Sequence, residues 1–88
     1  MHRNGEFILR QVAGKYVVVP IGQAAEAFKG MITLNKTGKF LWDCLAQEQT
    51  EESLAKALVD KYGISEERAL EAVKKFLEPI YPTGAIVK

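Results

Sequence analysis

The first third of the chain carries short apolar stretches of the kind that form β-strands. Residues 7–12 (FILRQV) alternate imperfectly between apolar and polar side chains, and residues 16–20 (YVVVP) are rich in β-branched residues. Ala13 and Gly14 provide a turn between them, which predicts a hairpin. After a connection in which AEAF is expected to make one helical turn, residues 30–34 (GMITL) predict a third strand. The simplest topology is a three-stranded antiparallel meander whose first and third strands are the edges.

The rest of the chain changes to helical periodicity. Asn35 is a favourable N-cap for a helix over residues 36–47, Thr50 caps a second helix that Gly63 ends, and Ser65 caps a third. Apolar residues recur at helical spacing in all three: Phe40, Leu41, Cys44 and Leu45, then Leu54, Ala55, Leu58, Val59 and Tyr62, then Leu70, Val73, Phe76, Leu77 and Ile80. Pro79 disfavours helix at Glu78, which predicts a stop or a kink there. The last residues, TGAIVK, are expected to form a short strand or a loose tail.

These elements predict an α+β fold, in which a three-stranded antiparallel sheet is followed by a three-helix bundle. The order is that of a winged helix-turn-helix with its sheet placed first, and such an architecture permits several functions. With 88 residues, the chain is expected to form one domain over residues 1–88, because a chain of this size buries only about two thirds of its unfolded surface.

The overall charge and hydropathy exclude several classes of protein. The formal net charge of +1 gives no basic excess of the kind that nucleic-acid-binding domains show. No apolar run approaches the roughly 20 residues of a membrane span, and the N-terminus lacks the apolar stretch of a secretory signal. We therefore expect a cytoplasmic protein with neither a nucleic acid nor a membrane as its partner. The single cysteine, Cys44, cannot form an intrachain disulfide.

The chain has little material for catalysis. His2 lies in a terminal segment that is expected to be mobile, and Cys44 lies on an apolar helical stripe, where a free cysteine behaves as a small buried hydrophobe. The sequence has no carboxylate pair, no metal-spaced His/Cys cluster and no Gly-rich phosphate loop. We expect no enzymatic activity, no cofactor and no metal.

DNA binding is the main alternative, because a helix-turn-helix places its second helix in the major groove. Here that helix begins Ser65-Glu66-Glu67, whose carboxylates would repel phosphate. The cations Arg68, Lys74 and Lys75 are balanced by Glu71 and Glu78, a pattern that is typical of a solvated face.

The third strand is the remaining candidate site. Natural edge strands are usually blunted by Lys, Pro or a bulge, whereas GMITL contains none of these and only Lys29 stands at its entrance. An extended peptide could pair with such an edge. Alternation places Met31 and Thr33 on one face and Ile32 and Leu34 on the other. From the pattern alone, a strand covered by the chain's own tail or by a second copy is an equal alternative.

Several segments resemble the PqqD family, in order along nearly the whole chain: VAGKYVVVP at residues 12–20, GMITLNKTG at residues 30–38, Leu41-Trp42 and Leu45, and Thr50-Glu51-Glu52 with Leu54. The Leu-Asn-x-Thr-Gly-x-x-x-Trp segment is the most specific part. Members of this family are RiPP recognition elements, small domains that bind the leader segment of a ribosomally made precursor peptide and deliver it to modifying enzymes. The resemblance implies a stand-alone leader-peptide binding protein.

In that family the leader adds as an antiparallel strand to the third strand and lies against the third helix. Carried over, the peptide-binding positions are Phe28, Lys29, Gly30, Met31, Ile32, Thr33 and Leu34 on the strand, and Arg68, Ala69, Ala72, Val73, Lys75 and Phe76 on the helix. The small alanines would leave space, Phe76 would floor a pocket, and the two cations would meet acidic leader side chains. Val73 and Phe76 fit the core equally well.

The resemblance also bears on partners. It implies two partners, a precursor peptide and a peptide-modifying enzyme such as a radical SAM enzyme or a leader peptidase. The protein itself is expected to be a monomer or a weak homodimer, and quinone-cofactor, lasso-peptide and radical-based pathways all fit.

We interpret Asn35, Gly38 and Trp42 as structural. The family's usual ending after the third helix is interrupted here by Pro79 and Pro82. The apolar tail is therefore hypothesised to fold along the open edge and compete with the leader, so that deleting residues 83–88 would tighten binding.

Overall fold

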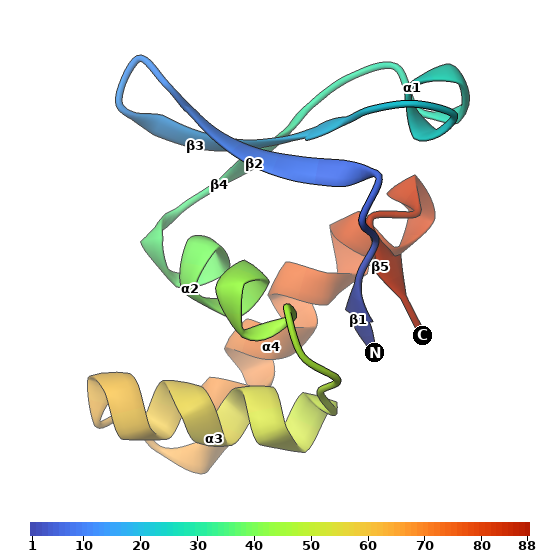
Figure 1. The fold of residues 1–88 in the computed structure, drawn as a ribbon. Coiled ribbons are helices and arrows are strands. Elements are labelled where there is room, and N and C mark those ends of the chain that lie inside the picture. Colours follow the sequence, from blue (N-terminus) through green and yellow to red (C-terminus); the bar gives the residue numbers. More distant parts are fainter.

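The computed structural model describes residues 1–88 as two small sheets and a set of helices (Figure 1). The larger sheet has the order β2-β3-β4 and consists of β2 (Phe7–Val12), β3 (Lys15–Pro20) and β4 (Ile32–Leu34). The helices are α1 (Ala24–Ala27), α2 (Lys36–Cys44), α3 (Glu51–Tyr62), α4 (Glu66–Ile80) and the 3-10 helix η1 (Tyr81–Thr83). Two short strands, β1 (His2–Arg3) and β5 (Ile86–Val87), form the second sheet. The predicted α+β class and the meander are confirmed.

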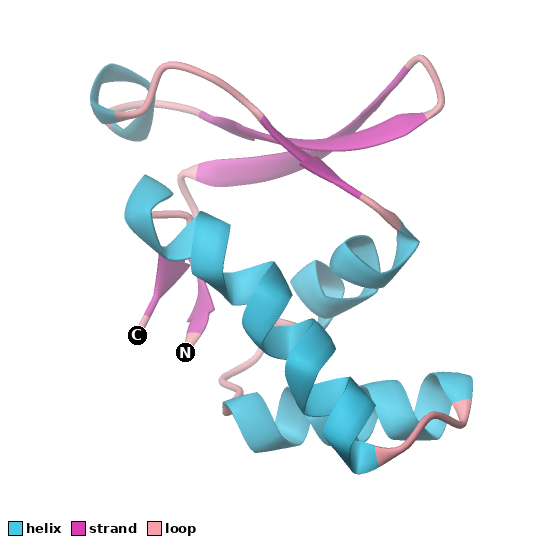
Figure 2. Cartoon of the chain, turned by 180° about the vertical axis from the view of Figure 1, so that it is seen from behind, coloured by secondary structure: helices cyan, strands magenta, loops and turns pink.

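The larger sheet packs one face onto the helices. Its strands are antiparallel, with Leu9 opposite Val18 and Val18 opposite Ile32, so these side chains share one face. That face joins Trp42, Leu58 and other residues in a core cluster of 16 buried residues. Figures 1 and 2 show α2, α3 and α4 all on the same side of the sheet.

Strand β4, which the sequence predicts as a third strand over residues 30–34, is shorter than expected. It begins at Ile32 and leaves Gly30 and Met31 outside. The cause lies in β3. By the observed register, residue 30 would face Pro20, and proline has no N–H to donate across the ladder. Pairing therefore stops at the bridge between Ile32 and Val18.

The hairpin turn between β2 and β3 has both central residues in the left-handed region, with φ of 51° at Ala13 and 79° at Gly14. Val12 and Lys15 flank it as partners, so the connection is a two-residue turn of the primed type that matches strand twist. Glycine adopts this conformation freely, whereas alanine is strained there.

We therefore expect Ala13→Gly to stabilise the protein by about 1 kcal/mol, because the left-handed strain at this position disappears. Chemical denaturation of the two proteins would measure the difference. Ala25→Gly, at an exposed position of α1, serves as the control and is expected to destabilise, since glycine costs about 1 kcal/mol in a helix. A less stable Ala13→Gly protein would contradict the assigned turn.

The helix caps are those predicted. Asn35 accepts from the Gly38 N–H at 2.7 Å, Thr50 and Ser53 form a capping box, and Ser65 accepts from the Arg68 N–H at 3.2 Å. Gly63 ends α3 in the left-handed conformation, with φ of 67°. Helix α2 ends at Cys44, three residues before the boundary predicted at residue 47, and the Gln49 side chain donates to the Cys44 carbonyl at 2.9 Å.

The last helix does not take the first of its two predicted outcomes at Pro79, which was a stop. Helix α4 runs through Pro79 to Ile80 and passes into η1 instead of stopping at Glu78. Proline in the last turn removes only one helical hydrogen bond, and Leu77 and Ile80, both 2% exposed, hold this turn in the core.

The two ends of the chain pair with each other, and two predictions about them are wrong. His2 and Arg3 lie opposite Val87 and Ile86, so the start of the chain is a strand, and the His2 ring nitrogen lies 3.1 Å from a Glu48 carboxylate oxygen. The tail does not cover the edge of β4. Ala85 and Ile86 are instead buried in the core, at 0% and 5% exposure, so deleting residues 83–88 would remove core side chains.

Candidate functional site: an open strand edge beside a cleft

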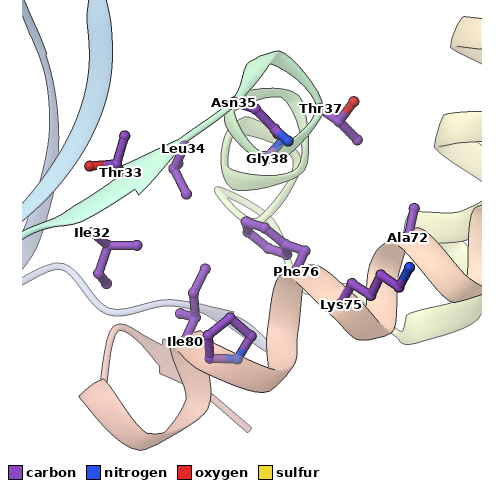
Figure 3. Close-up of a pocket in the computed structure, with 11 residues that line it drawn as sticks. Ile32, Thr33, Leu34, Asn35, Thr37, Gly38, Ala72, Lys75, Phe76 and Ile80 are labelled. Atoms are coloured by element: carbon purple, nitrogen blue, oxygen red, sulfur yellow. The ribbon is translucent and has the colours of Figure 1, made fainter.

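A cleft of about 360 Å³ lies between β4 and the C-terminal half of α4 (Figure 3). Strand β4 lines it with Ile32, Thr33 and Leu34, and the start of α2 with Asn35, Thr37 and Gly38. Helix α4 lines it with Ala72, Lys75, Phe76, Pro79 and Ile80. The cleft therefore brings together segments that are some 40 residues apart in the sequence.

The floor of the cleft is apolar and belongs partly to the core. Phe76 is 9% exposed and Ile80 is 2% exposed, and both belong to the core cluster with Leu34. Figure 3 shows the side chains of Ile32, Leu34, Phe76 and Ile80 directed into the space between the strand and the helix. Such a floor favours an apolar side chain of a bound segment, which would lose its contact with water there.

One edge of β4 has no partner strand. Within the sheet, β4 pairs with β3 alone, and no other strand is hydrogen-bonded to its second edge. That edge borders the cleft and carries neither lysine nor proline within β4. It presents free main-chain groups beside an apolar pocket, as an arriving strand would need.

The register identifies which main-chain groups are free. A two-residue hairpin closes with a hydrogen-bonded pair, here Val12 and Lys15, and such pairs alternate along antiparallel strands. Lys15, Val17 and Val19 therefore bond to β2, whereas Tyr16 and Val18 bond to Leu34 and Ile32 of β4. It follows that the N–H and C=O of Thr33 point to the open edge.

The junction from β4 to α2 is closely packed. A Cβ atom on Gly38 would lie 3.3 Å from Asn35 Oδ1 and 3.4 Å from Leu34, so glycine allows the first turn of α2 to sit against the end of the strand. Asn35 accepts the Gly38 N–H in the same turn. The junction thus fixes one end of the cleft, which supports the structural interpretation of both residues.

Lys75 is the one charged side chain that lines the cleft. Its Nζ lies 3.3 Å from the Glu71 carboxylate one helical turn away, and its side chain is 75% exposed. An exposed ion pair of this kind contributes little to stability. Lys75 can therefore leave Glu71 and pair with a carboxylate of a bound segment at little cost in free energy.

The structure sorts the thirteen residues predicted for peptide binding into three groups. Six line the cleft: Ile32, Thr33, Leu34, Ala72, Lys75 and Phe76. Four lie on the approach to β4: Phe28, whose ring packs 6.2 Å from that of Phe7, and the exposed Lys29, Gly30 and Met31. The other three do not line the cleft, because Ala69 and Val73 are fully buried in the core and Arg68 is exposed nearer the start of α4.

The prediction missed five lining residues, namely Asn35, Thr37, Gly38, Pro79 and Ile80. Pro79 and Ile80 follow Phe76 by three and four residues, so they lie on the same side of the helix as Ala72 and Phe76. The helical periodicity of the sequence was therefore enough to predict them. Asn35, Thr37 and Gly38 follow β4 directly, in the same specific motif; from the sequence we interpret Asn35 and Gly38 as structural and assign Thr37 no role.

The structure also bears on thiol reactivity, metal binding and membrane insertion. Burial raises the pKa of the Cys44 thiol, and the neighbouring Asp43 carboxylate adds to the rise, which lowers the fraction of reactive thiolate at neutral pH. No group of three or more His, Cys, Asp or Glu side chains is placed to hold a metal ion. None of the helices is long and apolar enough to cross a membrane.

The sheet, the helices and the open-edged cleft define a small α+β domain with a groove between a strand and a helix. The chain belongs to the PqqD family, because the family described as Coenzyme PQQ synthesis protein D (PqqD) matches residues 8–81. A search of curated proteins gave no match. Among solved structures, TbiB1 in complex with the TbiA(beta) leader peptide has the same fold, with a TM-score of 0.74 at 13% identity, covering 97% of this chain and 93% of that one.

Proposed function

We propose that this protein is a leader-peptide adaptor, which binds the leader segment of a ribosomally made precursor peptide and presents it to a modifying enzyme. The observation that carries the proposal is the open edge of β4 beside the apolar cleft. A leader strand pairing with Thr33 would take affinity from main-chain hydrogen bonds and specificity from the pocket over Phe76. Membership of the PqqD family and the fold shared with TbiB1, whose structure holds a leader peptide, support it.

In this proposal the protein acts without catalysis, as a single domain over residues 1–88, and the enzyme partner supplies the chemistry. A radical SAM enzyme and a leader peptidase are the two classes that the family suggests. DNA binding is disfavoured because α4 begins with Glu66 and Glu67, both exposed, where groove-reading residues would be needed.

An amide-resolved NMR titration with the leader segment of the cognate precursor peptide tests the proposal. We expect saturable shifts in residues 28–34 and in α4 between Ala72 and Ile80, because these amides border the cleft. A scrambled leader and an unrelated DNA duplex are the controls and are expected to leave these amides unchanged. The absence of leader shifts, or DNA shifts at the start of α4, would overturn the proposal.

A further inference from the structure

The outer face of the sheet is more apolar than a solvated face should be. An antiparallel sheet with one buried face normally alternates apolar residues inward with polar residues outward. In β3, Val17 and Val19 face away from the helices, because Tyr16 and Val18 occupy the inner face with Leu34 and Ile32. Extending the same alternation places six apolar residues on the outer face: Ile8, Val12, Val17, Val19, Ile21 and Met31.

No element of the chain covers this outer face. Figures 1 and 2 show every long helix on the opposite side of the sheet. Five large hydrophobic residues of the chain are exposed, and three of them lie here: Val12 at 55%, Ile21 at 42% and Met31 at 62%. Val17 is buried but does not belong to the core cluster. The exposed residues are spread along the face, from Val12 at the hairpin turn to Ile21 after β3, with the half-buried Ile8 and Val19 between them. A continuous apolar face of this kind marks an interaction surface.

The charges at the hairpin end of the face have one sign. Arg10 lies opposite Val17 and Lys15 opposite Val12, both on the outer side, and neither takes part in an ion pair. At the other end of the strands the same alternation places one carboxylate, that of Glu6 opposite Ile21, and it accepts a hydrogen bond from the Gln23 N–H at 3.2 Å in the adjoining loop. A partner that fits this face is apolar at its centre and carries carboxylates opposite Arg10 and Lys15.

We infer that the outer sheet face docks the modifying enzyme, through an apolar enzyme surface flanked by carboxylates. The inference rests on the proposed leader binding, because the two surfaces are continuous. A leader strand added at β4 widens the sheet and places every second side chain on the outer face, next to Thr33 and Met31. An enzyme seated there contacts the domain and the bound peptide together, so it binds the loaded protein more tightly than the empty one.

The double variant Arg10→Glu/Lys15→Glu tests the charge complementarity. The probes are the cognate modifying enzyme and the cognate leader segment, and isothermal titration calorimetry measures each affinity separately. We expect enzyme binding to the leader-loaded variant to weaken at least tenfold, with leader affinity unchanged within twofold. The matched control, Lys56→Glu/Lys74→Glu, makes the same change of charge at exposed positions of α3 and α4 and is expected to bind the enzyme normally.

Val12→Ser tests the apolar part without a change of charge, at the exposed end of the hairpin, and is expected to weaken enzyme binding severalfold. Circular dichroism verifies that each variant is folded. Unchanged enzyme affinity in both outer-face variants, or an equal loss in the control, would overturn the inference. If the unmodified protein did not bind the leader at all, the proposed function would be overturned instead. Failure of the enzyme-docking inference and failure of the proposed function are therefore distinguishable.

Discussion

Thr33→Pro is expected to lower leader affinity by about tenfold or more while the sheet stays intact. The Thr33 N–H points to the open edge, so proline removes a donor offered to the leader but no hydrogen bond to β3. Its ring also stands where the incoming strand must lie. Loss of one main-chain hydrogen bond lowers the binding free energy by about 1 kcal/mol. The steric conflict adds to this loss, and a total of roughly 1.4 kcal/mol corresponds to a tenfold lower affinity. Fluorescence anisotropy with a labelled leader measures it.

Two further variants separate the backbone effect from other causes. Thr33→Val keeps the N–H and a side chain of similar shape, and we expect its leader affinity to match that of the unmodified protein. Ile32→Pro should behave differently, because the Ile32 N–H pairs with Val18 and its loss loosens β4 from the sheet. Equal leader affinity for Thr33→Pro and Thr33→Val would show that the leader does not pair with this edge.

Phe76→Ala is expected to affect both stability and binding. The ring is 9% exposed and forms part of the core as well as the cleft floor, so truncation should lower the free energy of unfolding by about 3 kcal/mol. Leader affinity of the folded fraction should fall at least tenfold, since the apolar anchor loses its floor. Thermal unfolding and titration at a temperature where the variant is folded measure the two effects.

Phe40→Ala provides the matched control for loss of an aromatic ring. Phe40 is half-buried, packs edge-to-face against Tyr62 with ring centroids 6.1 Å apart, and does not line the cleft. The Phe40→Ala variant should be less stable than the unmodified protein but bind the leader with the same affinity. If both variants lost leader affinity in proportion to stability, Phe76 would be a core residue without a direct part in binding.

Local signals were sufficient for most of the fold. The caps at Asn35, Thr50 and Ser65 and the turn at Ala13-Gly14 act within a few residues, and each is found where the sequence predicts it. The pairing of β1 with β5 escaped prediction, since two-residue strands have no periodicity and their partners lie at opposite ends of the chain.

The cleft was predicted in position but not in detail. The sequence indicated the strand and the helix, and Ala72, Lys75 and Phe76 line the cleft as expected. It did not indicate which part of the helix faces the strand, because Ala69 and Val73 fit the same inward stripe as Phe76. Both side chains are buried in the core, and the helix wall of the cleft runs from Ala72 to Ile80 instead. Such a choice depends on tertiary packing, which periodicity alone does not specify.

Pro79 has a consequence for how the helix wall meets a peptide. In an α-helix the carbonyl of residue 75 accepts from the N–H of residue 79, and proline has none. The Lys75 carbonyl oxygen is thus released from the helical pattern at a place where both residues line the cleft. The helix wall opposite the strand therefore lacks one of its regular main-chain hydrogen bonds within the stretch that lines the cleft, between Lys75 and Pro79.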